Sequence, residues 1–74
     1  MIARYLVRDM SVCGYGEEYA STLRIACRIA DIDILRARIV NEPIYVDILE
    51  YDALAHDYIP AIRMLDDYSM EALS

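Results

Sequence analysis

The residue best suited to acid–base chemistry is His56, which has Asp52 four positions before it and Asp57 directly after it. On a helix, Asp52 and His56 would face each other. A hydrolytic dyad of this kind also needs a nucleophile, and no Ser or Cys lies at a suitable spacing. A metal site needs a third ligand, which the sequence around the pair does not supply. We therefore interpret it as a solvated pair, and predict no catalytic residue, no metal ligand and no enzyme activity.

Gly14 and Gly16 form a second candidate, a Gly-x-Gly pair of the kind found in phosphate-binding loops. No Gly-Lys-Ser/Thr run follows, and Tyr19 stands where the third glycine of a dinucleotide fingerprint would be. Glu17 and Glu18, directly after the pair, would repel a phosphate. The sequence therefore predicts a turn and a helix entry here, and no cofactor.

Cys13 and Cys27 lack the further cysteines that a metal set requires. The N-terminal apolar run includes Arg4 and Arg8, which is not typical of an export signal. No segment approaches the roughly 20 apolar residues of a membrane span. We therefore expect a cytoplasmic chain with free thiols and no membrane partner.

The charge is distributed unevenly along this acidic chain, whose net charge is −6. Residues 1–40 carry six arginines against five acidic residues, whereas residues 41–74 carry one arginine against eight. A chain this acidic is not expected to bind nucleic acid directly, because phosphate binding requires clustered Lys or Arg. The acidity of the second half instead suggests a partner protein with a basic surface.

The carboxylates of the second half could form one negative ridge, and neighbouring tyrosines could supply aromatic anchors. The alternative is that acidic residues merely keep the chain soluble. A partner or a homodimer is also favoured because 58% of the residues are hydrophobic, more than a small monomer easily buries. The predicted partner-binding residues are Glu50, Asp57, Tyr58, Asp66, Asp67 and Tyr68.

The elements that would carry these residues are predicted from periodicity. Apolar and polar side chains alternate from residue 34 to residue 49, with a break at Asn41-Glu42-Pro43, which is typical of a β-hairpin. Residues 1–9 also alternate and predict a strand, whereas residues 17–32 have the spacing of an amphipathic helix.

From Glu50 onward the spacing is helical, and Pro60 is expected to separate two short helices. The sequence thus predicts a single α+β domain over residues 1–74, a small three-stranded sheet with helices on one face in the order β-α-β-β-α. Four residues are expected in its core between sheet and helices: Leu23, Ile39, Val46 and Ile62.

The other sheet face is predicted to carry Arg4, Arg8, Arg36 and Arg38. Arginines and nearby tyrosines on a sheet can bind single-stranded RNA, which is the weaker alternative because the chain has no Phe and lacks the aromatic signature of such folds. The favoured interpretation is cross-strand pairing of the arginines with carboxylates.

In size, acidity and lack of a catalytic motif, the whole chain resembles the small phage-encoded inhibitors of host defence, the anti-CRISPR and antirestriction proteins. The resemblance includes no motif, so it assigns no role to any residue. It implies a non-enzymatic inhibitor that blocks a nucleic-acid-handling protein by protein–protein contact. Antitoxins and small adaptor proteins share this format, and the alternative is a homodimeric adaptor or antitoxin that assembles through its sheet.

Overall fold

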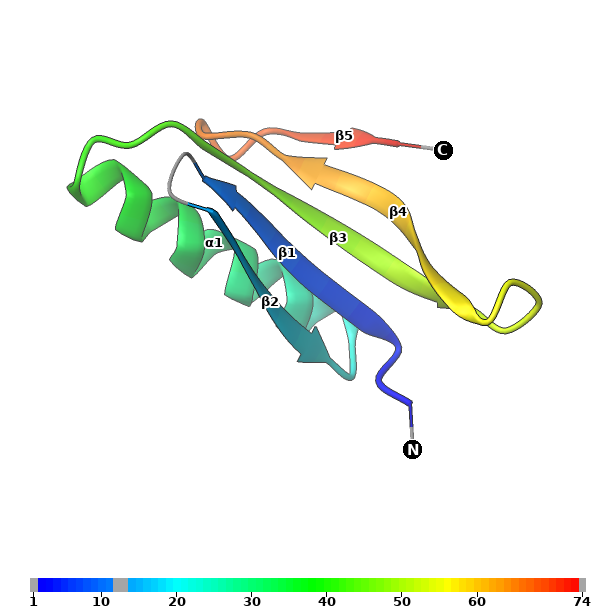
Figure 1. Ribbon diagram of the computed structural model, residues 1–74. Helices are drawn as coiled ribbons and strands as arrows, with labels where there is room; N and C mark the ends of the chain where they lie inside the picture. The colour runs from blue at the N-terminus through cyan, green and yellow to red at the C-terminus, as the bar shows by residue number, and fades with distance from the viewer. Residues whose placement is uncertain (1, 12–13, 74) are drawn as a thin grey trace.

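The computed structural model describes residues 2–11 and 14–73. Five strands form one antiparallel sheet in the spatial order β2-β1-β3-β4-β5, and one helix runs across one of its faces (Figure 1). The predicted three-stranded sheet with two helices, in the order β-α-β-β-α, is therefore wrong, although the arrangement is still α+β-like. The elements are β1 (Tyr5–Ser11), β2 (Gly14–Ala20), α1 (Leu23–Ile39), β3 (Ile44–Asp52), β4 (Asp57–Met64) and β5 (Met70–Ala72).

Strand β2 occupies the stretch that was predicted to begin the helix. It pairs with β1 from Tyr5 opposite Ala20 to Ser11 opposite Gly14. The Gly16 N–H donates a hydrogen bond to the Asp9 carboxylate. A Cβ at Gly16 would lie 2.8 Å from Asp9 Oδ1, so this close approach suits a residue without a side chain. The glycines thus serve a hairpin rather than a helix entry.

Helix α1 begins later and ends later than predicted. Thr22 is its N-cap, and the Thr22 hydroxyl accepts a hydrogen bond of 3.2 Å from the Ile25 N–H. The helix continues to Ile39, and Asn41 beyond it has a positive φ of 57°, a common way to end a helix. The predicted first strand of a hairpin at residues 34–40 is therefore wrong, because residues 34–39 form the second half of α1 and Val40 is its C-cap.

Strand β3 confirms the predicted strand at residues 44–49 and extends it to Asp52. The two helices predicted after Glu50 are wrong, because β4 and β5 occupy that stretch. Pro60 is accommodated because β5 pairs only with Ile62–Met64 of β4, which leaves Pro60 on an uncovered edge. It also lies at a register shift opposite Leu49, where a missing N–H is tolerated.

The core lies between α1 and the sheet. The helix contributes mainly alanines, which let it approach the strands closely, and the strands contribute the larger side chains. Of the four predicted core residues, Val46 is confirmed as fully buried and Ile62 is half-buried, whereas Leu23 and Ile39 are exposed. The core residues are Val7, Ala20, Ala26, Ala30, Ile34, Val46, Ile48 and Met64.

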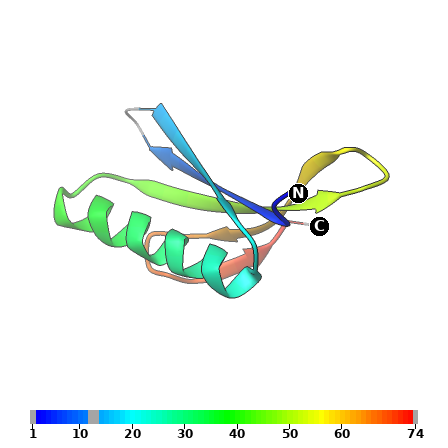
Figure 2. The ribbon, with the colours of Figure 1, turned by 90° about the horizontal axis from the view of Figure 1, so that it is seen from below.

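Figure 2 shows α1 on one side of the sheet, and no other described element covers the opposite side, which we call the open face. Leu6 and Leu49 are cross-strand neighbours on this face, and both are buried. Their outer neighbours in the same row are Tyr19 on β2 and Pro60 on β4. The open face therefore has a small apolar layer of its own.

Candidate functional site

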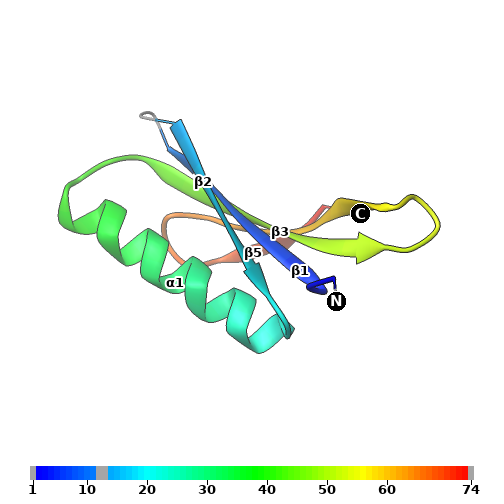
Figure 3. The same ribbon diagram turned by 60° about the horizontal axis from the view of Figure 1, so that its bottom comes forward.

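The turn between β3 and β4 projects beyond α1, as Figure 3 shows. The Asp52 carboxylate accepts a hydrogen bond of 2.9 Å from the Leu54 N–H, and His56 closes the turn with a φ of 52°. Leu54 at its tip is 95% exposed. We call residues 50–58, together with Ile2, Ala3 and Tyr19, the hairpin end.

Three tyrosines pack against one another at the hairpin end. Tyr51 and Tyr58 are cross-strand partners, and their ring centroids lie 5.3 Å apart in an edge-on arrangement. The Tyr19 ring lies 5.7 Å from that of Tyr58. The Tyr58 hydroxyl donates a hydrogen bond of 2.5 Å to the carbonyl of Ala3, which ties the N-terminal segment to β4. Burial, followed by the neighbouring Tyr19 and Tyr51, raises the pKa of Tyr58 above its usual value.

A cavity of about 580 Å³ opens beside this cluster. Its walls are mostly apolar or aromatic, with the His56 imidazole and the tyrosine hydroxyls as polar groups. Such walls can stack on a flat group, cover an aliphatic chain or hold a cation over a ring. Within residues 2–11 and 14–73, no group of three or more His, Cys, Asp or Glu could hold a metal ion. The lining residues are Ile2, Ala3, Tyr19, Tyr51, His56 and Tyr58.

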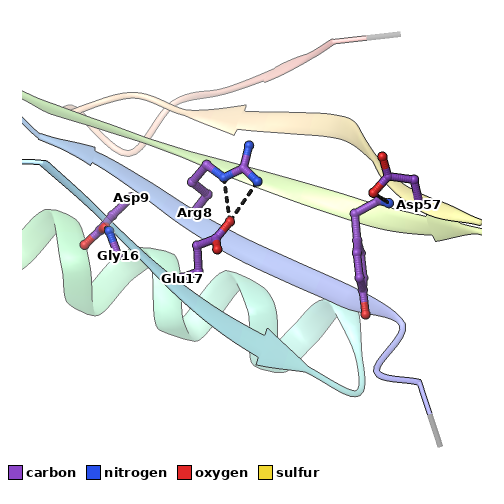
Figure 4. Close-up of polar contacts among 6 residues, drawn as sticks. Arg8, Asp9, Gly16, Glu17 and Asp57 are labelled. Carbon is purple, nitrogen blue, oxygen red and sulfur yellow. Dashed lines mark hydrogen bonds and ion pairs between the residues drawn. The ribbon is translucent and has the colours of Figure 1, made fainter.

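The structure separates the six predicted partner-binding residues into two groups. Glu50, Asp57 and Tyr58 lie at the hairpin end, where Figure 4 shows Asp57 on β4. Asp66, Asp67 and Tyr68 follow the other end of β4, and the eight residues of that strand span roughly 25 Å. The predicted acidic residues therefore do not form one continuous ridge.

The second group belongs to the turn between β4 and β5. The Asp67 carboxylate accepts hydrogen bonds from the Ser69 N–H (3.0 Å) and hydroxyl (2.5 Å), and these bonds lower the pKa of Asp67. Arg38 of α1 donates a 2.8 Å hydrogen bond to the Asp66 carbonyl, and its guanidinium lies 5.7 Å from the centre of the Tyr68 ring. These contacts attach the turn to the helix.

The arginines predicted for one sheet face are distributed over α1, β1 and the segment before β1. Arg36 and Arg38 lie on α1, so their placement on the sheet is wrong. Arg4 precedes β1 and pairs with Glu50 at 3.2 Å. Arg8 lies on β1, on the open face.

Arg8 belongs to a row of charges that alternate in sign across all five strands of the open face. Arg8 pairs with Glu17 at 2.7 Å (Figure 4), and Arg63 makes two hydrogen bonds of 2.8 and 3.2 Å to Asp47. The Arg63 guanidinium also lies 4.3 Å from the centre of the Tyr45 ring. We call this set the charge ladder, and its members in strand order are Glu17, Arg8, Asp47, Arg63 and Glu71.

A third group of carboxylates lies where α1 faces the β1–β2 hairpin. Burial raises the pKa of Asp33 to about 6, with further contributions from Asp9 and Glu18 that outweigh the opposing effect of Arg36. The folded state therefore binds this proton more tightly than the unfolded state does. The stability associated with protonated Asp33 is present at low pH and is lost as the pH rises from about 4 to about 6.

The change Asp33→Asn is accordingly expected to stabilise the protein at pH 7 by about 1 kcal/mol, after allowance for solvent screening. At pH 4 the gain should vanish, because Asp33 is then mostly protonated in the native protein. Urea unfolding at both pH values measures this difference. The same change at the exposed Asp31 serves as the control. A gain in stability from Asp33→Asn that is independent of pH would contradict the raised pKa of Asp33.

Tyr19 and Ile2 line the cavity but are not among the predicted site residues. Tyr19 was assigned to a helix, and only the pairing of β2 with β1 brings it to the cavity. The sequence feature that places Tyr19 outside the helix is Thr22. Thr22 is a strong N-cap residue, so the helix starts after Tyr19.

Cys27 is half-buried, and burial together with Asp31 raises the pKa of its thiol. Cys13 lies outside the described residues.

No helix in the described part of the chain is both long and apolar enough to cross a membrane. Comparison with known proteins found no matching family model, no matching curated protein and no matching solved structure.

Proposed function

We propose that this chain is a non-enzymatic protein-binding domain whose hairpin end contacts a basic surface of another protein. The observation that carries the proposal is the cluster of Tyr19, Tyr51 and Tyr58 beside an apolar-walled cavity, with Ile2 and Leu54 exposed around it. Tyr51 and Tyr58 are half-buried and Tyr19 is exposed, and tyrosines beside a pocket are typical anchors of protein interfaces. An exposed apolar group of this kind also favours a partner over bare solvent.

The charges at the same end support a basic partner. Glu50, Asp52 and Asp57 lie there, and Glu50 pairs with Arg4. A negative end attracts a positive surface over a distance and accelerates its association. On contact, an Arg or Lys side chain of the partner would enter the cavity and lie against the tyrosine rings, where cation–π attraction stabilises it.

Basic surfaces are the surfaces with which proteins hold phosphate backbones. Occupation of such a surface by the hairpin end would exclude nucleic acid, so we propose an inhibitor of a nucleic-acid-handling protein in the cytoplasm. This activity requires no cofactor. The carboxylates act mainly on the rate of association, and the tyrosines act mainly on the lifetime of the complex.

The experiment is capture of the partner from a lysate of the source cells, followed by binding kinetics at two salt concentrations. Asp57→Lys should slow association several-fold at low salt and less at high salt, because salt screens exposed charges. Asp66→Lys makes the same change in charge at the other end of β4 and should have a much smaller effect. Equal effects of the two changes would contradict the hairpin end as the contact surface.

Tyr58→Ala should raise the Kd for the captured partner by about 30-fold or more, mainly through faster dissociation, because it removes a central anchor. Tyr58→Phe keeps the ring and loses only the hydrogen bond to Ala3, so it should retain most of the affinity. The wild-type chain should also compete with nucleic acid for the partner. If partner and nucleic acid bind independently, the inhibitory function is wrong.

A further inference from the structure

Helix α1 places four of its large apolar side chains on the side that faces away from the core. Ile25, Ile32, Leu35 and Ile39 are 44%, 49%, 51% and 75% exposed, whereas the buried side of the helix carries mostly alanine. Together with Arg28 they recur at alternating intervals of three and four residues, which is the pattern of a coiled-coil seam. We call these five residues the outer ridge.

A depression runs beside the outer ridge. A cavity of about 440 Å³ lies between α1 and the β4–β5 turn, and it is lined by Asp31, Ile32, Leu35 and Tyr68. Arg38 stabilises its far wall, since its guanidinium binds the Asp66 carbonyl and lies near the Tyr68 ring. Side chains of a second helix can therefore insert into the depression and pack between the side chains of the outer ridge, as knobs pack into holes in a coiled coil.

We propose that the outer ridge is the interface of a homodimer in which the α1 helices of two copies pack antiparallel. A twofold axis brings the same patch of both copies together, so the ridge must be complementary to itself. When Ile32 packs against Leu35 of the second copy, helical geometry places Asp31 beside Arg38 of the second copy. The symmetry repeats this contact, which gives two opposite-charge pairs at the edges of the apolar seam.

The alternative parallel arrangement is disfavoured by Arg28. In a parallel pair this residue would meet Arg28 of the second copy in the seam, and two like charges would be brought together. In the antiparallel pair it lies opposite Ile39 of the second copy, where the aliphatic part of Arg28 covers the isoleucine and the guanidinium reaches water. The Asp31–Arg38 pairs thus favour a second copy of this chain as the partner, and Arg28 favours the antiparallel arrangement of the two helices.

The oligomeric state tests this proposal. Sedimentation equilibrium of the full chain should show a dimer of about twice the 8.5 kDa chain mass. Leu35→Glu should raise the dimer Kd by about 100-fold, because it places two charges in the seam. Leu54→Glu, the same change at the hairpin end, should leave the dimer intact. A monomeric wild type, or a dimer that tolerates Leu35→Glu, would overturn the proposal.

A charge exchange tests the orientation. Asp31→Arg alone and Arg38→Glu alone should each raise the dimer Kd by about tenfold, and the double variant should restore it. Thermal unfolding of Arg38→Glu monitors the loss of its contact with the β4–β5 turn. Failure of the double variant to restore the dimer would overturn the antiparallel arrangement. The hairpin end takes no part in this contact, so this inference and the proposed function can fail independently.

Discussion

Ile34→Ala is expected to destabilise the protein by about 2–5 kcal/mol, the range for removing a large aliphatic side chain from a packed core. Ile34 has no exposed surface, and it lies in the middle of α1 within the core between helix and sheet. Alanine is a better helix former than isoleucine, so the loss measures packing rather than helix propensity. Urea unfolding in dilute solution, monitored by circular dichroism, measures the free energy of unfolding.

Ile39→Ala is the matched control, because it makes the same change in the same helix at a position that is 75% exposed. At protein concentrations below the Kd of the proposed dimer, its cost to the monomer should stay within about 0.5 kcal/mol, the usual range for surface substitutions. The predicted hairpin places Ile39 in the core, so this pair of variants also distinguishes the helix from that hairpin. A loss at Ile39 that matches the loss at Ile34 would contradict the observed orientation of α1.

Asp47→Ala is expected to have the second largest effect on stability, a decrease in Tm of about 5–10 °C. The Asp47 side chain is only 15% exposed and accepts two hydrogen bonds from Arg63, which raise the pKa of that arginine. It also lies opposite Arg8 on β1. Its removal leaves two guanidinium groups on either side of β3 without the carboxylate between them.

Glu50→Ala provides the comparison for Asp47→Ala. It breaks the ion pair between Arg4, whose side chain is 68% exposed, and Glu50, whose side chain is 44% exposed. The change should shift Tm by no more than about 2 °C, because exposed ion pairs contribute little to stability. Thermal unfolding at low and high salt measures both variants. If the two changes are equal in size, the charge ladder contributes no more than an ordinary surface pair.

Local pattern predicted some elements correctly and failed where two periods fit the same residues. The strand at residues 44–49 is confirmed because its alternation coincides with a one-sided core, in which Val46 and Ile48 are buried. The alternation of Leu35, Ala37 and Ile39 suggested a strand equally well. These three residues lie on a helix, because Ala37 continues the buried spacing of the first half of α1 and the other two face outward.

The stretch after Glu50 shows how tertiary contacts override local spacing. Its apolar residues have helical intervals, yet the stretch forms the end of β3, a turn, β4 and β5. The spacing predicts that Pro60 separates two helices, whereas Pro60 lies in a strand on the part of the edge that β5 does not cover. A proline can occupy either position, and only the pairing of β3 with β4 decides between them.

The sequence by itself determined the net charge of −6, the concentration of acidic residues in the second half and the surplus of apolar side chains, because these depend only on which residues the chain contains and in what order. Only the tertiary structure decided which of these residues share a surface. Sheet order brings Glu17, Arg8, Asp47, Arg63 and Glu71 together from five strands, and the length of β4 separates Asp57 at its start from Asp66 beyond its end. The reason is physical: pairing between strands distant in sequence follows from burial of a common core, and no local pattern records which strands will meet.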